Sequence, residues 1–324
     1  MKKKHLFGWL AAAVTTGVLA MGTAAAQTPL KMAYALSEDS HYGAGAAAFV
    51  EAMADNEDFV IEQFPNSALG GEREVIEGLQ LGTVDVALVS TGAILNFVPE
   101  TGVFDIPFLF RDLEHARNVL DSDIGAGMLE EFPKHGLVAL AWGEQGFRHL
   151  TNSKRAVETP EDIKGLKIRI TENPIHLEAF RELGVLATPM AWPEVATALQ
   201  QGTIDGQENP LSVIVSTKMW QLQDYLSLTG HVYAPALILI SPLVYDGLSD
   251  EEKEQFLEAG KTAALAMRDY VDTVEQDGLE TLKENGMQVN EVDYAAFETA
   301  VEPVYKAYYD QFGEDLIESI RNAQ

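Results

Sequence analysis

The sequence LQLGTVD at residues 79–85 recurs as LQQGTID at residues 199–205, 120 positions later, with conservative changes only. In both copies the glycine stands where a left-handed residue ends a helix, and the residues after it predict the start of a strand. The first copy continues into VALVSTG and the second into GQENPLS, so the shared phrase is followed by side chains of different chemical character. We therefore expect two units of similar construction; convergence on a good helix-to-strand junction is the alternative explanation.

The elements around each copy alternate between strand and helix. Up to the first copy, the apolar patterns predict strands at 29–36, 59–65 and 83–90 and helices at 44–55 and 72–82. Around the second copy, the same reasoning predicts two strands and two helices, in the order strand 165–170, helix 174–184, helix 192–202 and strand 203–208. This alternation predicts the α/β class, with a parallel sheet covered by helices on both faces.

The ends of the two repeated strands are the expected place for a ligand. In open α/β sheets, ligands bind beyond the carboxyl ends of the strands. Two facing lobes would each supply one such edge to a shared cleft. We therefore expect Ser90, Thr91 and Gly92 to face the segment 207–210, which has the sequence Gln-Glu-Asn-Pro.

The last third of the chain predicts a long helix. Ser249 and Glu252 form a capping box, and the helical pattern runs on to Asn285 and Gly286. Thirty-odd residues at about 1.5 Å each give a rod of roughly 50 Å, which would lie across both lobes. Two helices with a break near Gly278 are the alternative.

The first 26 residues have the pattern of a secretory signal peptide. Three lysines at positions 2–4 precede an uncharged apolar stretch from Leu6 to Met21, and Ala24–Ala26 offers a small-residue cleavage site. An N-terminal membrane anchor is the alternative, but the apolar run is short for a spanning helix. We expect a soluble chain exported to the periplasm, with no membrane insertion after cleavage.

The composition narrows the possible partners. The chain contains no cysteine, which excludes disulfides and thiolate metal sites. Its formal net charge is −28, so nucleic acid and anionic lipid are poor partners. An anionic ligand would therefore need a local cluster of arginine or lysine.

No motif in the sequence predicts a cofactor, a metal or a catalytic centre. The glycines of 43–48 match only part of a dinucleotide fingerprint, and 121–125 resembles a calcium loop without its final glutamate. The sequence has no His-Glu-x-x-His and no Gly-x-Ser-x-Gly motif. We expect a binding protein without a cofactor; a secreted hydrolase or lyase with Glu72 or Glu172 as its base is the alternative.

Two arginines are the best candidates for binding an organic acid. Arg169 alternates with Ile168 and Ile170 near the end of a strand, so it points away from the apolar face. Arg148 lies where the chain enters the second unit. A guanidinium group presents a fixed fork that binds a carboxylate through two parallel hydrogen bonds.

Five segments resemble those of one family. They are LGGEREVIEGLQLGTVDVALVSTG, GFRHLTNS, PEDIKGLKIRI, TPMAWPEVATALQQGTIDGQENPL and TGHVY. In this order they resemble the substrate-binding proteins of tripartite ATP-independent periplasmic (TRAP) transporters of the DctP type. The resemblance implies a two-lobed periplasmic-binding-protein fold (type II-like) with hinge strands and a long helix that spans both lobes. The expected lobes are 27–145 plus about 235–274, and 146–234 plus about 275–324.

The resemblance also implies the ligand-binding residues. Arg169 takes the position of the family's main carboxylate-binding arginine, and Arg148 that of a second arginine. Asn209 takes the position of an asparagine that hydrogen-bonds the carboxylate, and Trp192 that of an aromatic residue against the ligand. The remaining expected pocket residues are Glu72, Glu172, Ser90, Thr91 and Tyr233.

We therefore expect a monomeric solute-binding protein that captures a small organic acid by lobe closure. The resemblance implies delivery to the small and large TRAP membrane subunits, driven by sodium. Two acids in the pocket favour a sugar acid or hydroxy acid, while a C4-dicarboxylate or an ectoine-like zwitterion stays open. A periplasmic sensor protein is a further alternative.

Overall fold

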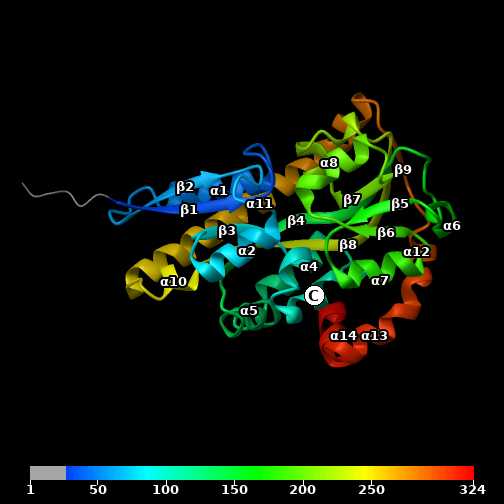
Figure 1. Cartoon of the computed structure of the whole chain (residues 1–324). Helices are drawn as coiled ribbons and strands as arrows, with labels where there is room; N and C mark the ends of the chain where they lie inside the picture. Colours follow the sequence, from blue (N-terminus) through cyan, green and yellow to red (C-terminus); the bar gives the residue numbers. More distant parts are fainter. Residues whose placement is uncertain (1–26) are drawn as a thin grey trace, which may run out of the picture.

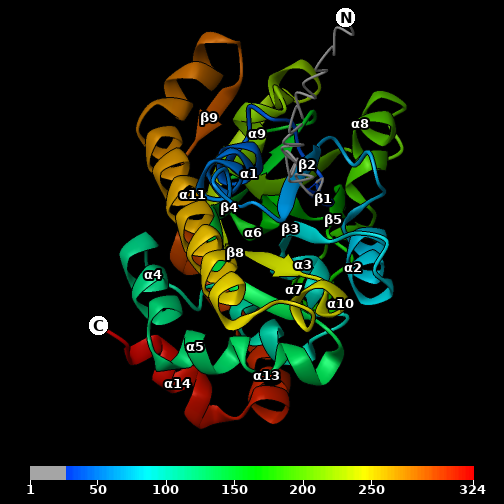
Figure 2. The ribbon, with the colours of Figure 1, turned by 90° about the vertical axis from the view of Figure 1, so that its left-hand side faces the viewer.

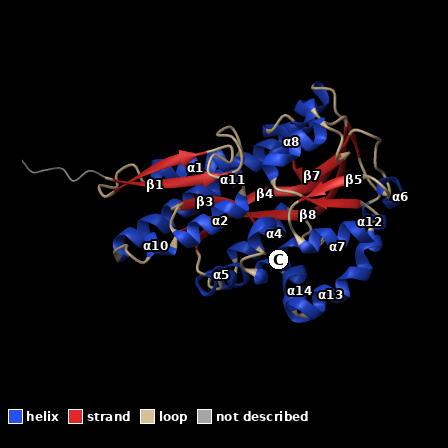
Figure 3. Ribbon diagram, viewed as in Figure 1, coloured by secondary structure: helices blue, strands red, loops and turns tan. Residues whose placement is uncertain are grey.

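The computed structural model describes residues 27–324, and its strands form one sheet (Figures 1 and 3). The predicted signal peptide lies outside the described residues. The strand order is β2-β1-β3-β8-β4-β7-β5-β6, and β9 pairs with β8. The strands are β1 Thr28–Tyr34, β2 Phe59–Phe64, β3 Val86–Ser90, β4 Val138–Asn152, β5 Lys167–Ile170, β6 Leu186–Pro189, β7 Gly206–Pro210, β8 Tyr225–Ile240 and β9 Gln288–Asn290.

The sheet consists of two similar parallel groups joined by two long strands. β2, β1 and β3 are parallel at one end, and β6, β5 and β7 are parallel at the other. β8 pairs with β3 and β4 pairs with β7, both in antiparallel orientation. β4 and β8 pair with each other along most of their length, so they connect the two groups as hinge strands. The predicted two-lobed α/β fold is confirmed.

Helices cover both faces of the sheet (Figure 3). The main helices are α1 His41–Ala52, α2 Glu72–Leu81, α4 Leu113–Asp121, α5 Asp123–Leu129, α7 Pro174–Glu182, α8 Trp192–Gln200, α11 Asp250–Glu284, α12 Tyr294–Val301, α13 Tyr305–Phe312 and α14 Glu314–Asn322. Short helices are α3 Thr91–Ile94, α6 Pro160–Ile163, α9 Leu211–Ser216 and α10 Pro242–Tyr245. Between residues 27 and 324, no helix is long and apolar enough to cross a membrane.

Both copies of the repeated phrase form the predicted junction between a helix and a strand. Gly82 and Gly202 follow α2 and α8 with φ angles of 72° and 68°, in the left-handed region that glycine adopts without steric cost. The strands begin at residues 86 and 206, three residues later than predicted. The sequence Thr-Val/Ile-Asp forms the turn instead, because the aspartate side chains bond to the neighbouring strands.

The two aspartates share one contact, a hydrogen bond to the neighbouring strand, and Asp205 also pairs with Lys154 and Lys167 at 3.5 and 3.8 Å. Asp85 Oδ2 accepts a hydrogen bond from the backbone N–H of Lys31 at 2.8 Å, and Asp205 Oδ2 accepts one from that of Lys167 at 2.9 Å. Lys31 lies in β1 and Lys167 in β5, the strands next to β3 and β7. Each aspartate thus fixes the register of its own parallel group.

The long helix α11 is continuous over 35 residues (Figure 2). It begins at the predicted capping box of Ser249 and Glu252, and it packs against α1, β4 and α9. The alternative break near Gly278 is wrong. Gly260 allows close packing instead, since a Cβ there would lie 2.7 Å from Cβ of Leu140 in β4.

The motifs that resembled cofactor and calcium sites are structural. Residues 43–48 lie within α1, and a Cβ at Gly45 would lie 2.7 Å from Cγ of Met267 in α11, so this glycine serves helix packing. Ser122 caps α5 between Asp121 and Asp123. In the described part of the chain, no group of three acidic, histidine or cysteine residues could hold a metal ion.

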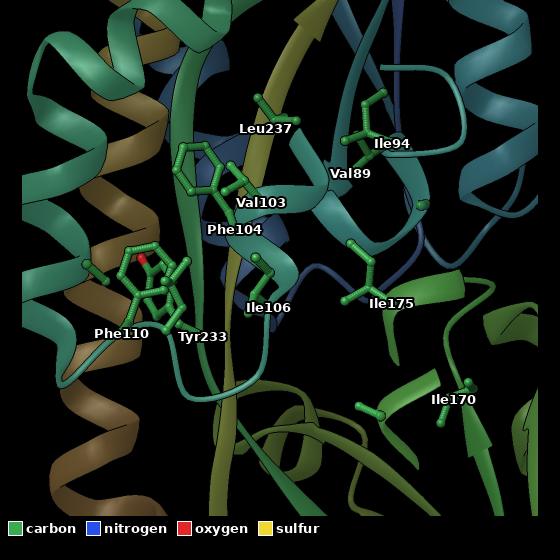
Figure 4. Packing of buried hydrophobic residues seen from close by; sticks show 14 of the residues in the cluster. Val89, Ile94, Val103, Phe104, Ile106, Phe110, Ile170, Ile175, Tyr233 and Leu237 are labelled. Carbon is green, nitrogen blue, oxygen red and sulfur yellow. The ribbon is translucent and has the colours of Figure 1, made fainter. Parts of the chain in front are cut away.

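The largest hydrophobic core lies under the sheet and includes residues of both parallel groups (Figure 4). Phe104 and Phe110 pack there with Tyr233, and Ile170 and Ile175 enter the same cluster from the second group. The C-terminal helices close this core from below. The hydroxyl of Tyr305 donates to the carbonyl of Pro107, and a ring nitrogen of His115 lies 2.8 Å from the carbonyl of Ile320. The C-terminal helices therefore contact residues that follow β3 in the chain. The expected lobe boundaries remain a proposal.

Candidate functional site

A partly open pocket lies where the two parallel groups of strands meet. It collects side chains that follow β3 and β7 and side chains from α1, α2, β4, β5 and α8. Its cavity volume is about 60 Å³. Of the nine predicted ligand-binding residues, seven line this pocket: Arg169, Arg148, Asn209, Trp192, Glu72, Glu172 and Ser90.

Arg169 is a buried cation that is fixed at one end and free at the other. Its Nε donates to the carbonyl of Met190 at 2.9 Å, and its guanidinium carbon lies 5.7 Å from the ring centroid of Trp192. In the described residues, this is the one hydrogen bond that its side chain makes. Burial lowers the pKa of Arg169 to about 10, and the nearby Glu208 opposes this shift. The group therefore stays charged at neutral pH and can bind a carboxylate.

Arg148 is held by a buried ion pair. Its Nε lies 2.5 Å from Oε2 of Glu208, and its Nη2 donates to Oε1 of Glu208 at 2.9 Å. The same Nη2 donates to Oδ1 of Asn209 at 3.2 Å. Burial raises the pKa of Glu208, but Arg148 and the hydrogen bond from His231 outweigh burial and hold that pKa well below its usual range. Arg148 thus fixes the side chain of Asn209 at the pocket wall.

The sequence analysis did not identify Glu208 and His231 as a unit. His231 Nε2 lies 3.2 Å from Oε2 of Glu208, and its Nδ1 lies 2.7 Å from the hydroxyl of Thr229. Burial lowers the pKa of His231, although the hydrogen bond to Glu208 opposes this. These residues lie in β7 and β8, 23 positions apart in the chain, so no local spacing could join them.

Glu72 organises the opposite wall of the pocket. Its Oε1 accepts hydrogen bonds from the hydroxyl of Tyr42 and the backbone N–H of Ser90, both at 2.9 Å. Its Oε2 accepts from the hydroxyl of Ser90 at 2.5 Å. Tyr42 also lines the pocket, and the sequence analysis missed it because it lies in a helix of small residues without a recognisable motif.

Two predicted residues do not reach the pocket. Thr91 starts α3, where the side-chain period changes from two to 3.6, and its hydroxyl turns back to Oδ1 of Asp105 at 3.1 Å. Tyr233 lies on the other face of β8, packs against Phe110 and donates to Oε1 of Glu144 at 2.9 Å. Thr91 and Tyr233 are therefore not among the residues that line this pocket.

The two groups of strands touch across the mouth of the pocket. The side-chain amide of Asn96 donates to the backbone carbonyl of Glu172 at 2.8 Å, and a Cβ at Gly92 would lie 3.1 Å from Cγ2 of Thr171. The side chain of Glu172 itself is exposed at the mouth. The two groups are thus in contact with each other, and both contribute side chains to the pocket.

The pocket is suited to binding a carboxylate. Arg169 offers free N–H donors, while the acids Glu72 and Glu208 already accept hydrogen bonds from neighbouring side chains. Neither of these two carboxylates is therefore placed as a free base next to a nucleophile. Of the two bases considered for a secreted hydrolase or lyase, Glu72 is thus engaged by its neighbours, and Glu172 lies exposed at the mouth.

Comparison with known proteins identifies the family. Residues 32–311 match the family described as bacterial extracellular solute-binding protein, family 7 (DctP). A solute-binding protein of Verminephrobacter eiseniae is 47% identical over 305 residues, which cover 93% of this chain and 91% of the relative.

Solved structures agree with this assignment. A TRAP periplasmic solute-binding protein of Bordetella bronchispeptica, whose bound density is assigned to pantoate, is 69% identical with a TM-score of 0.91 and covers 92% of this chain and 100% of its own. One from Polaromonas sp JS666, bound to D-erythronate, is 49% identical with a TM-score of 0.91 over 92% and 99% of the two chains. The chain belongs to the DctP family of bacterial extracellular solute-binding proteins, which are the periplasmic solute-binding proteins of TRAP transporters.

Proposed function

We propose that this protein captures a small organic acid of the hydroxy-acid or sugar-acid kind in the periplasm. It delivers the acid to the small and large membrane subunits of a TRAP transporter, and it works as a monomer without a cofactor. The observation that carries the proposal is Arg169, a buried guanidinium group with free donors that lines the pocket.

The chemistry of the pocket supports a carboxylate as the anchoring group. The free end of Arg169 matches the two oxygens of a carboxylate. Arg148 and Asn209 supply a further positive charge and a further polar contact on the same wall, and Trp192 packs beside the guanidinium group. Glu72 and Ser90 lie on the pocket wall formed by the half of the molecule that contains β2, β1 and β3. Glu172 lies at the mouth.

The ligands of similar proteins support the hydroxy-acid class. The relatives described above hold pantoate and D-erythronate, and a DctP protein of Advenella mimigardefordensis with 34% identity holds galactonate. A protein of Sulfurospirillum deleyianum with 31% identity holds succinate, so the family also binds dicarboxylates. The cavity of about 60 Å³ favours a short acid, since one water needs about 10–15 Å³ on this scale.

Ligand capture depends on closure of the two halves. A ligand that contacts Arg169 from one half and Glu72 from the other stabilises the closed arrangement relative to an open one. The long strands β4 and β8 run between the halves and provide the hinge for such a rigid-body movement. Closure also removes the carboxylate from water, which strengthens its attraction to Arg169.

Calorimetric titration with short hydroxy acids and dicarboxylates tests the proposal. We expect stoichiometric binding without turnover, and we expect Arg169→Ala to weaken it by about 100-fold or more, because a buried charge pair loses one partner. Arg181→Ala, which changes an exposed arginine on α7, serves as the matched control and should bind like the unaltered protein. Unchanged binding by Arg169→Ala would contradict the proposed site, and conversion of the acid would support the enzyme alternative.

A further inference from the structure

The wall of the pocket opposite Arg169 is built from three side chains that share two protons. Tyr42 and Ser90 each direct their hydroxyl to the carboxylate of Glu72. All three residues line the pocket, and Tyr42 and Ser90 are 2% and 7% exposed. These contacts determine which hydrogen-bonding groups the wall can offer to a ligand.

An ionised carboxylate accepts hydrogen bonds and donates none, whereas each hydroxyl has one proton and two lone pairs. Both hydroxyl protons are used in the contacts with Glu72, so Tyr42 and Ser90 present only lone pairs to the pocket. Glu72 has about four acceptor positions, and the two hydroxyls and the backbone N–H of Ser90 occupy three of them. These three side chains therefore accept hydrogen bonds and have no proton to give.

We infer that Tyr42, Glu72 and Ser90 form an acceptor set that binds a hydroxyl of the ligand distal to its carboxylate and rejects a second carboxylate. The inference rests on the proposed function, and it narrows the ligand class to monocarboxylic acids with a hydroxyl at the far end. Glu72 is a positioning residue in this arrangement, because it orients the protons of the two hydroxyls. A second carboxylate would place two acceptor oxygens against the acceptor set, with no hydrogen bond to compensate for the lost water.

Arg73 is the competing feature on the same half. It follows Glu72 in α2 and lines the pocket, so it could attract a second carboxylate. Its side chain is 56% exposed, however, and its Nε donates to Glu77 at 3.3 Å along the outer surface of the helix. An exposed pair of this kind contributes little, so the buried acceptor set dominates selectivity.

Three acids that differ only at the fourth carbon test the inference. D-Erythronate ends in a hydroxymethyl group, 4-deoxyerythronate ends in a methyl group, and meso-tartrate ends in a second carboxylate. With the unaltered protein, calorimetry should give the tightest binding for D-erythronate. The deoxy acid should bind about 10- to 100-fold more weakly and meso-tartrate about 100-fold more weakly or worse.

Glu72→Gln changes the polarity of the wall while conserving its shape. The new amide donates hydrogen bonds, so the hydroxyl of Ser90 can turn its proton to the pocket. The preference for D-erythronate over meso-tartrate should fall by about tenfold or more. Ser90→Ala removes one acceptor and should weaken D-erythronate more than 4-deoxyerythronate. Glu74→Gln removes an exposed charge from the same helix and should leave the preference unchanged.

The possible outcomes separate this inference from the proposed function. Equal affinity for D-erythronate and meso-tartrate, or an unchanged preference in a Glu72→Gln protein that melts like the unaltered one, overturns the acceptor set alone. If the unaltered protein binds meso-tartrate tightly and Arg73→Ala abolishes this binding, Arg73 binds the second carboxylate. This result would also overturn the acceptor set. If none of the three acids, nor pantoate, binds to the unaltered protein, the proposed hydroxy-acid function fails and the inference fails with it.

Discussion

Residues 81–90 and 201–210 have the same succession of exposed and buried positions, although they lie in different halves of the molecule. Both segments contain a glycine with a φ angle near 70°, and both contain an aspartate that bonds the neighbouring parallel strand at 2.8 or 2.9 Å. The five strand residues that follow are buried in each case. The repeated phrase therefore encodes one folding junction that is used twice.

The two halves differ in the residues that occupy equivalent strand positions. Leu88 and Val89 of β3 correspond to Glu208 and Asn209 of β7, since the offset between the copies is 120. Arg169 stands two residues after Lys167 in β5, at the position where β1 has alanine. The first half uses these positions for an apolar core, whereas the second half uses them for buried charges beside the pocket. The comparison shows that folding depends on the shared residues and that the candidate site depends on the divergent ones.

The largest expected loss of stability comes from replacing Glu208 of β7 by an uncharged residue. The equivalent position of β3 is also uncharged. Glu208→Ala leaves the guanidinium group of Arg148 buried without its partner. We expect the free energy of unfolding to fall by about 3–5 kcal/mol in chemical denaturation, because an uncompensated buried charge is costly.

The double variant Arg148→Met/Glu208→Leu is the control, because it removes both charges and keeps apolar volume. It should lose much less stability than Glu208→Ala, since replacement of a buried ion pair by apolar residues is often neutral. An equal loss in both proteins would mean that packing volume at position 208, and not charge, sets the stability of β7.

The second prediction concerns one buried histidine in each half. Burial lowers the pKa of His41 in α1 to about 3, and burial with the nearby His231 lowers the pKa of His149 in β4 to about 3. Both groups are neutral in the folded state and have an ordinary pKa near 6.5 when unfolded. Their contribution to stability is thus complete above pH 6.5 and decreases as the pH falls toward 3.

Denaturation curves at a series of pH values test this. In a plot of the free energy of unfolding against pH, each histidine should add about 1.4 kcal/mol per pH unit to the slope between about pH 5.5 and 4. His41→Gln and His149→Gln should each remove a similar part of the slope. If only His149→Gln changes the slope, His41 is less buried in solution than His149. The two halves would then differ in the burial of their histidines as well as in the residues at their strand ends.

Local chemistry explains which features the sequence could predict. The helix ends at Gly82 and Gly202 and the capping box at Ser249 depend on neighbouring residues, so periodicity and turn chemistry identified them. The late strand starts were missed because the side-chain bonds of Asp85 and Asp205 hold the preceding residues in a turn. Alternation alone cannot show such a contact with another strand.

The candidate site was less predictable because its residues meet only in the folded chain. Alternation assigned Arg169 to the polar side of a short strand, whereas Tyr233 was expected in the pocket only from the family resemblance. β4 and β8 have register shifts, including one next to Gly146 with its φ of 103°, and these change the face on which a side chain lies. Tyr42 carries no motif at all, and only the packing of α1 brings it to Glu72.

A smaller effect is expected when the shared aspartates are changed. Asp85→Ala and Asp205→Ala each remove a side-chain acceptor for one backbone N–H, that of Lys31 or Lys167. Each should lower the free energy of unfolding by about 1–2 kcal/mol, and Asp205→Ala should cost about 0.2–1 kcal/mol more, because it also removes the pairs with Lys154 and Lys167. Chemical denaturation of the two variants measures both values. A difference of 2 kcal/mol would show that the junctions are alike in geometry but not in energy.

The smallest difference between the two halves is expected at the two glycines of the repeat. Gly82→Ala and Gly202→Ala force a left-handed backbone on alanine, which costs about 1–2 kcal/mol at each position. A Cβ at position 202 meets no atom within 4 Å, whereas one at position 82 would lie 2.7 Å from Cδ1 of Leu243. Leu243 is 67% exposed and can move, so Gly82→Ala should cost only a few tenths of a kcal/mol more. Because the backbone cost is common to both, the difference between the two melting curves isolates the contact with Leu243. A reversed order would mean that the second junction is the more strained, and the equivalence drawn from the φ angles would then fail.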